Sequence, residues 1–314
     1  MCIRDRDDII ALSATSNANG VAASFSVAGS VSGDANAGDA LSEARTDADA
    51  LATGITGGTG VDTILSNTSI DATAESTATA VAAGFSVGIG NEGNVTTGTV
   101  VSDASSLATT RAVGIDGGAD ADTIGGDKGI TGGIVLLADS AANGVAASFS
   151  VAGSVEGTAQ AGDALSEART DADAEAIGIV GGTGGDTITS ATAIDATAAS
   201  TATAVGAGFS VGVGNEGDVT SGAAVSDASS LATTRAVGIG GGAGDDTITS
   251  TTAGDFTIIT TADSEANGVA ASFTVSGSVS GAANAGDALS EARTDASAAA
   301  TGIAGDDGMD TVFS

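Results

Sequence analysis

The sequence has no histidine, proline, tryptophan or tyrosine, and only one cysteine, Cys2. A single cysteine excludes a disulfide framework, and without histidine or a second thiolate a transition-metal site is excluded as well. Histidine is also the usual general acid or base near neutral pH, so we expect no enzymatic activity. A calcium-dependent polysaccharide lyase would need one non-repeating cleft of aspartate and arginine, which the repetitive sequence does not favour.

Basic residues are scarce as well. Eight lysines and arginines face 40 aspartates and glutamates, for a formal net charge of −32. Nucleic acid and anionic membranes need basic clusters, so both are excluded as partners. No apolar run approaches the roughly 18–20 residues of a membrane-spanning helix, so membrane insertion is not expected. Calcium ions and an extracellular or cell-surface location are the natural complement of this charge.

Large apolar side chains are few, because most of the 42% hydrophobic content is alanine and valine and the only aromatic residues are seven phenylalanines. What the sequence has in abundance is glycine, 49 residues, and repetition. The segment NGVAASFSVAGSV at 19–31 returns at 143–155 and, slightly changed, at 267–279, a shift of 124 residues each time. A shorter unit lies within each block, and its steady period predicts a stacked array. The apolar residues before successive glycine-rich turns mark this period: Phe25, Ile55, Phe85, Ile115, Phe149, Ile179, Phe209, Ile239, Phe273 and Ile303.

The repeats define the expected domain organisation. Residues 1–8 have no counterpart in the later copies, and we interpret them as a non-native start. Residues 9–314 are predicted to form a single array, with blocks 9–132 and 133–256 and a partial block 257–314. We interpret the chain as a fragment of a longer protein, in which each unit packs against neighbouring repeats of the same chain.

Within a unit the residues alternate with period two, which is typical of strands. In 70–88 the even positions hold little beyond alanine, serine and glycine. Two such faces are expected to approach more closely than the usual ~10 Å between packed sheets. Near each phenylalanine both faces are apolar or small, which predicts burial on both sides. The alternative in 38–52 is an alanine-rich helix beginning at Asp39.

The predicted fold class is all-β. A β-solenoid with ~30-residue rungs is favoured, because the alternative is a meander of long antiparallel hairpins packed through Ala/Gly/Ser faces, and strands of that length are unusual. The two differ in where the turns lie. In the solenoid we expect turns with Asp34, Glu92, Glu156 and Glu216 to stack between the GGxGxD turns, whereas in the meander they lie at the far end.

The clearest motif is GGTGVDTIL at 57–65, which returns at 117–125, 181–189, 241–249 and, less closely, 305–313. It resembles the G-G-x-G-x-D-x-U-x nonapeptide of RTX (haemolysin-type) calcium-binding repeats, within a repeat region similar to those of large bacterial adhesins. The copies depart from the pattern at Asp120 and Asp306, which replace glycines. The resemblance implies calcium as cofactor, held by the aspartates and by glycine carbonyls. The implied residues are Asp62, Asp122, Asp186, Asp246 and Asp310, with Gly57, Gly58, Gly60, Gly181, Gly182, Gly184, Gly241, Gly242 and Gly244. The alternative is a tight turn in which the aspartate binds its own backbone.

These features predict a structural role, a spacer or stalk segment of a secreted or cell-surface repeat protein that calcium stabilises. The alternative is a carbohydrate- or surface-binding module, in which Thr73, Thr77, Thr79 and their repeats form a regular flat face for an extracellular glycan or other surface ligand. We also expect stacked rungs to interleave the arginines of each unit with Asp47, Asp49 and their equivalents as a ladder of ion pairs.

Overall fold

The computed structural model describes residues 9–251 and 256–313, so the predicted non-native start lies outside the described residues. These residues form strands throughout, with a single short 3-10 helix, η1 (Gly126–Lys128), and no α-helix among them. None of the described segments is therefore a helix that could cross a membrane. The prediction of an all-β chain is confirmed, and the helical alternative for 38–52 is wrong.

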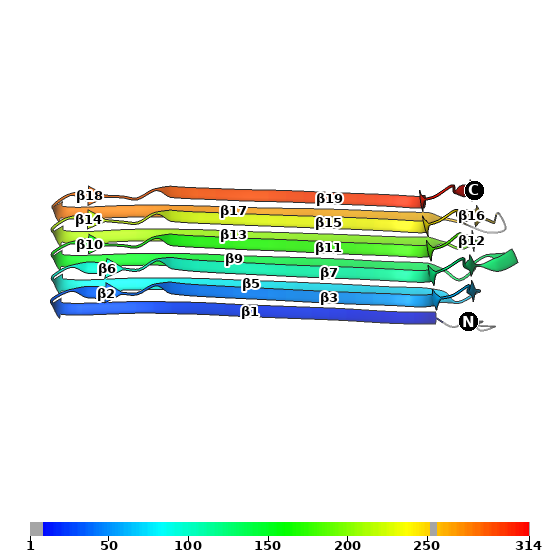
Figure 1. Ribbon diagram of the computed structural model, residues 1–314, viewed down its shortest axis with the longest axis horizontal. Helices are drawn as coiled ribbons and strands as arrows, with labels where there is room; N and C mark the ends of the chain where they lie inside the picture. Colours follow the sequence, from blue (N-terminus) through cyan, green and yellow to red (C-terminus); the bar gives the residue numbers. More distant parts are fainter. Residues whose placement is uncertain (1–8, 252–255, 314) are drawn as a thin grey trace.

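Ten long strands form two parallel sheets that face each other (Figure 1). We call the first the phenylalanine sheet; it consists of β1 (Ile9–Ser32), β5 (Ser69–Glu92), β9 (Ile134–Glu156), β13 (Ile194–Glu216) and β17 (Ile258–Ser280). The second, the arginine sheet, consists of β3 (Ala40–Thr59), β7 (Val100–Ala119), β11 (Ala164–Thr183), β15 (Ala224–Ala243) and β19 (Ala288–Asp307).

Short strands close the coil at its two ends (Figure 1). At the end that we call the aspartate end, after the GGxGxD turns, lie β4 (Thr63–Ile64), β8 (Thr123–Ile124), β12 (Thr187–Ser190), β16 (Thr247–Ser250) and β20 (Thr311–Phe313). At the opposite end, the far end, lie β2 (Ala35–Ala37), β6 (Val95–Thr97), β10 (Ala159–Gln160), β14 (Val219–Thr220) and β18 (Ala283–Asn284).

The register shows how the repeat builds the coil. Ile9 pairs with Ser69, and Ile70 pairs with Ile134, so paired residues lie two units apart in the sequence. Each unit therefore supplies one side of a β-solenoid, and two units complete one coil. The register steps alternate between 60 and 64 residues, and in the first of the longer coils η1 lies among the extra residues at the aspartate end. All strand pairs among the described residues are parallel, which excludes the antiparallel meander.

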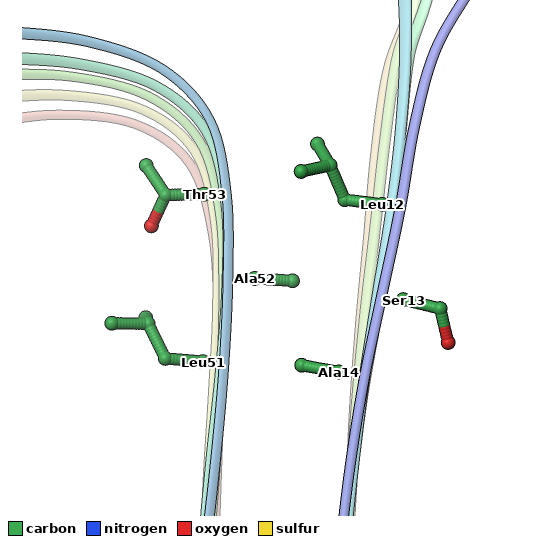
Figure 2. A pocket seen from close by; sticks show the side chains of 6 residues that line it. All are labelled: Leu12, Ser13, Ala14, Leu51, Ala52 and Thr53. Atoms are coloured by element: carbon green, nitrogen blue, oxygen red, sulfur yellow. The ribbon is translucent and has the colours of Figure 1, made fainter.

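Alternation sorts the side chains between core and surface (Figure 2). In the first coil Leu12, Ala14 and Ala52 point into the space between the two walls, whereas Ser13, Leu51 and Thr53 point away from it. Along the middle of the long sheets the core is a column of alanines, such as Ala78, Ala108 and Ala142, all fully buried. Toward the aspartate end the core takes isoleucines instead, because the walls diverge there.

The two long sheets are separated by a single layer of small side chains. Ser42 Oγ, on the arginine sheet, donates a 2.6 Å hydrogen bond to the carbonyl oxygen of Ala83 on the opposite sheet. Ser76 and Thr110 join the sheets in the same way, with 2.7 Å between their hydroxyl oxygens. These hydroxyls are thus satisfied across the core, as burial requires, whereas the buried hydroxyls of Ser106 and Ser230 have no hydrogen-bond partner.

The isoleucine column is buried in the core, whereas the phenylalanine column lies on the outer surface. Ile115 and Ile179 are fully buried, because alternation breaks at Gly114–Ile115, where two consecutive residues face the core. Val113 lies outside that core, in a separate buried cluster with Ile177 and Val237. Phe25, by contrast, is 69% exposed, and the phenylalanines of the inner coils are half-buried on the outer face. The prediction that both faces are buried near each phenylalanine is therefore wrong.

Candidate functional site

The five aspartates of the GGxGxD turns form a column along the aspartate end. The backbone N–H of each donates to Oδ1 of the aspartate one coil later: Asp62 to Asp122 at 2.7 Å, Asp122 to Asp186 at 2.7 Å, Asp186 to Asp246 at 2.8 Å and Asp246 to Asp310 at 3.0 Å. Successive coils lie ~4.8 Å apart, so the carboxylates repeat at that interval. The structure thus joins residues that are 60 or 64 positions apart in the sequence.

The second carboxylate oxygen has no partner. Asp122, Asp186 and Asp246 are at most 2% exposed, and their Oδ2 atoms are buried without a hydrogen bond. Asp62 Oδ2 is in the same situation. A buried acceptor of this kind is costly for an ionised carboxylate, because it loses water and gains no donor in return.

A glycine backbone lies beside each orphaned oxygen. A Cβ placed on Gly181 would stand 2.5 Å from Asp186 Oδ2 and 2.4 Å from the carbonyl oxygen of Gly241. The same construction at Gly241 gives 2.4 Å to Asp246 Oδ2 and 2.5 Å to the carbonyl oxygen of Gly305. Two acceptor oxygens therefore converge beside the first glycine of four copies of the motif, Gly57, Gly117, Gly181 and Gly241, and only a residue without a side chain leaves room for them.

The turn itself keeps one backbone conformation in every copy. Gly58, Gly182 and Gly242 have φ of 96°, 110° and 103°, in the left-handed region that glycine adopts without strain. Where the motif lacks a glycine, Asp120 and Asp306 adopt φ of 75° and 68°, and they are the only non-glycine residues in this region within the described part of the chain. Aspartate tolerates this conformation better than most residues, which explains how the departing copies keep the turn.

The stacked charges affect one another. Burial raises the pKa of Asp186, and the neighbouring carboxylates of Asp246 and Asp122 raise it further, while the hydrogen bond from the Asp122 backbone opposes the change. Burial also raises the pKa of Asp246, and the carboxylates of Asp310, Asp245 and Asp306 add to the effect. The column therefore favours a proton or a cation at its centre.

The ligand set for a metal is narrow. Within residues 9–251 and 256–313, no three acidic, cysteine or histidine side chains gather as a metal-binding group. A calcium ion would have to combine the orphaned Oδ2 with backbone carbonyl oxygens and water, all of them ligands that calcium accepts. The residues implied by the motif fit this requirement in kind, because hard oxygen atoms converge there and no other donor satisfies them.

The second set of turns does not contribute to this column. Asp34 accepts from the N–H of Asn94, and Asp218 from the N–H of Ala282, both at the far end of the coil. Glu92 lies over Glu156 at that same end. The prediction that Asp34, Glu92, Glu156 and Glu216 stack between the GGxGxD turns is wrong, because a coil holds two units and each kind of turn meets only its own kind.

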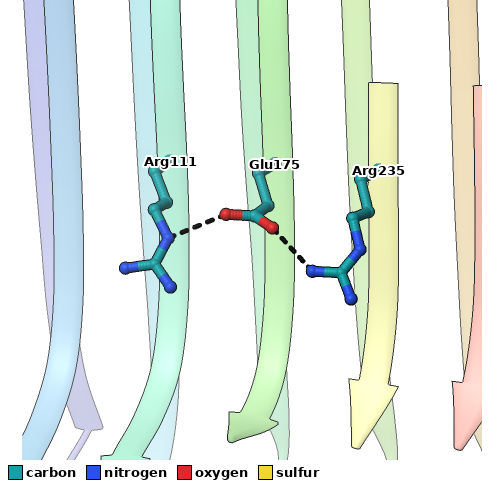
Figure 3. A network of polar contacts seen from close by, with 3 residues as sticks. All are labelled: Arg111, Glu175 and Arg235. Atoms are coloured by element: carbon teal, nitrogen blue, oxygen red, sulfur yellow. Dashed lines mark hydrogen bonds and ion pairs between the residues drawn. The ribbon is translucent and has the colours of Figure 1, made fainter. Parts of the chain in front are cut away.

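The arginine sheet carries the ion pairs of the described residues. Glu175 accepts from Arg111 Nε and from Arg235 Nη1, each at 2.8 Å, from the coils on either side (Figure 3). Arg169 and Arg293 pair with Glu167 and Glu291 of their own strands. The predicted interleaving of arginines with Asp47 and Asp49 is wrong, because Asp47 lies beside Leu107 and Asp49 beside Thr109.

The threonines of the phenylalanine sheet do not form a continuous lattice. Thr77 lies between Asn17 and Ala141 in its column, and Thr79 lies between Asn19 and Asn143. Threonine thus recurs at these positions only in every second coil. The surface-binding alternative stays a prediction, without the regular threonine face on which it depends.

A shallow pocket lies at the first described coil, lined by Leu12, Ala14 and Ala52 with their outward neighbours (Figure 2). In the next coil Ala72 and Ala112 occupy the corresponding columns. The pocket is therefore the cross-section of the core at that coil, and its alanine-rich wall offers a ligand little to bind.

Comparison with protein-family models, with curated protein sequences and with solved structures found no match. The resemblance to RTX repeats stays a prediction that rests on the nonapeptide motif. Sequence reasoning named the aspartates of the column and expected stacked turns, but it placed turns of the other kind between them. The available signal was that the motif occurs only in every second unit, so that its copies recur at twice the unit period.

Proposed function

We propose that this chain is a structural spacer segment of a secreted or cell-surface repeat protein, without catalysis. The observation that carries the proposal is the unbroken register between neighbouring coils, which runs from Ile9 against Ser69 to Ser30 against Gly90 and recurs at each step. Every coil contacts only its neighbours, and the chemistry repeats instead of converging on one site. Such an array gains stiffness with each hydrogen-bonded layer.

The spacer is broad rather than thin. A full coil, made of two units, advances the stack by only ~4.8 Å. Its long strands, which hold between 20 and 24 residues, extend across the stack. This geometry favours a stiff slab with two wide faces, suited to holding attached domains at a fixed distance and orientation.

Small-angle X-ray scattering tests the spacer. Doubling block 133–256 adds two coils, so the particle should lengthen by about 10 Å along the stack while its cross-section is unchanged. A flexible profile, or growth in all directions, would contradict the proposal.

We also propose that calcium neutralises the aspartate column. When bound, the ion would supply the positive charge that the orphaned oxygens of Asp122, Asp186 and Asp246 lack. Oδ1 of each carboxylate stays engaged with a backbone N–H, which fixes the side chain and directs Oδ2 toward the glycine carbonyl. The chain's own role is thus to hold acceptor oxygens together at the aspartate end, and water would complete the ligand set of the ion.

Thermal unfolding with and without calcium tests this part. A ligand at one hundred times its Kd stabilises the folded state by about 2.7 kcal/mol, so millimolar calcium should raise the Tm over that in chelator. Asp186→Asn should lose a clear share of the rise. Asp218→Asn is the matched control, since Asp218 also accepts a backbone N–H, at 2.9 Å, but is exposed at the far end. Equal responses in both variants, or no response to calcium in the unaltered chain, would refute calcium binding at the column and leave the spacer intact.

A further inference from the structure

The outer face of the phenylalanine sheet carries an apolar strip, which we define as Val21, Ala23, Phe25, Val27 and Gly29 together with their register partners in the other four coils. The valine, alanine and phenylalanine columns keep their residue type in every coil, and the last column holds glycine, isoleucine or valine. No member of the strip is charged or polar.

The strip is exposed along its whole length. Phe273 is 56% exposed and Val27 is 74% exposed, and Phe85, Phe149 and Phe209 are only half-buried although coils cover them on both sides. Neighbouring rings stack with centroids 4.8 to 5.5 Å apart and planes within 5° of parallel. Each inner ring therefore turns its faces to its neighbours and only its edge to solvent.

The ring geometry argues against a sugar as the occupant. Sugars stack on the faces of aromatic rings, and in the inner coils these faces are already covered by the neighbouring phenylalanines. Ring edges and valine methyl groups form instead a ridged apolar surface, which is the kind of surface that packs against another sheet at about 10 Å.

We propose that the apolar strip is the contact surface between two copies of this chain. The area of the strip suffices for a dimer: the eight residue spacings between positions 21 and 29, at about 3.3 Å each, and five coils at about 4.8 Å each give roughly 600 Å² per copy. Two copies would bury about 1,200 Å², which reaches the range of specific protein interfaces. Exposed apolar patches of this size on a single chain mark interaction sites.

The charge of the chain also favours contact at the strip. With a net charge of −32, two copies repel each other wherever their acidic surfaces meet. The outer face of the arginine sheet carries a carboxylate in every coil of one column: Glu43, Asp103, Glu167, Asp227 and Glu291. The strip has no carboxylate. It is therefore the broad surface at which two such chains can approach without bringing like charges together.

The periodicity of the strip makes it complementary to a second copy. Because each column repeats at every coil, the surface is matched to itself, as a two-fold symmetric contact requires. Ridges of phenylalanine on one copy meet grooves over the alanine column of the other at the same interval of ~4.8 Å. Each added coil enlarges the contact by the same amount.

The test is sedimentation equilibrium of the full chain over a wide concentration range. We expect a species of about twice the chain mass of 29.1 kDa. The triple variant Phe85→Lys, Phe149→Lys and Phe209→Lys should weaken the self-association at least tenfold. The matched control is Val101→Lys, Leu165→Lys and Val225→Lys, which places the same charges in the same coils on the outer face of the opposite sheet; it should leave the association intact.

Two further measurements test the dimer without relying on the fold of the triple variant. The single variant Phe149→Ser should weaken association severalfold with an unchanged circular dichroism spectrum. For the unaltered chain, raising the salt concentration should tighten the association, because salt screens the repulsion between acidic copies and does not weaken apolar contact. A monomer at every concentration, or a dimer that salt disrupts or that only the control variant abolishes, would overturn the proposal.

Discussion

The backbone N–H of Asp122 donates a 2.7 Å hydrogen bond to Oδ1 of Asp186, the aspartate at the same position one coil further along the chain. This bond links two buried carboxylates that repel each other, and it leaves one oxygen of each without a donor. The aspartate end therefore combines stacked hydrogen bonds with buried, neighbouring carboxylates, so its response to protons and cations is open to measurement.

Acidification should stabilise the chain in chelator. Burial raises the pKa of Asp186 and Asp246 above the ordinary 3.8, so the folded chain keeps protons that the unfolded chain has released. Their contribution is fully favourable below about pH 3.8 and is lost as the pH rises through the raised pKa values. We expect the Tm to rise between about pH 7 and pH 4.5, and Asp186→Asn/Asp246→Asn to rise less. An identical pH profile for both chains would show that the column does not titrate.

Gly181→Ala should destabilise the chain by about 2–3 kcal/mol, because overpacking forces the backbone apart. The new Cβ would stand 2.4 Å from the carbonyl oxygen of Gly241 and 2.5 Å from Asp186 Oδ2. Gly153→Ala is the control, since its Cβ would meet nothing closer than 3.9 Å. Urea unfolding should give Gly153→Ala a midpoint no lower than that of the unaltered chain, and a similar loss in both variants would refute the close approach at Gly181.

Ala142→Leu should prevent the two long sheets from closing. Ala142 is fully buried in the alanine column between the sheets, where a single small side chain fills the space. We expect a loss of about 3 kcal/mol or more, or failure to fold. Ala141→Leu changes the adjacent residue, whose side chain lies on the outer face, and should shift the unfolding free energy by no more than about 0.5 kcal/mol. If Ala142→Leu unfolded with the free energy of the unaltered chain, the gap between the two sheets would have to be wider than the alanine column indicates.

Glu175→Gln should have a small effect that depends on salt. Glu175 bridges Arg111 and Arg235 at 2.8 Å, yet its side chain is 29% exposed, and exposed pairs contribute only about 0–1 kcal/mol each. We expect a loss of about 1 kcal/mol in chemical unfolding at low salt, shrinking toward zero at molar salt. A larger loss of unfolding free energy that did not depend on salt would contradict this prediction. It would mean that the bridge holds the coils in register more strongly than its exposure suggests.

The sequence predicted the strands and the repeat because both are local. Period-two alternation in 70–88 and the steady spacing of the glycine-rich turns sufficed for a stacked all-β array. The small inner residues likewise anticipated the close contact that Ser42 makes with Ala83 across the core. The identity of the aspartates in the column followed from the motif alone.

The register between coils was harder to predict from the sequence. Neighbouring strands can be paired one unit apart or two units apart, and both pairings keep the alternation of inner and outer residues. The decisive difference is that like stacks on like: Phe25 lies over Phe85 and Ile55 over Ile115, at twice the unit period. Gly114 adds a bend that alternation does not foresee, so isoleucine turns inward where phenylalanine turns outward. Because alternation alone did not reveal this bend, the exposure of the phenylalanines on the outer face could not be predicted. The apolar strip that they form could not be predicted either.

One shorter and one longer coil together make up a single block, the length over which the sequence repeats almost unchanged. A whole block can therefore be deleted or duplicated in the gene without placing a single residue type in the wrong column. Gain or loss of a block would alter the length of the stack in increments of two coils, each variant folding by the same rules as its parent.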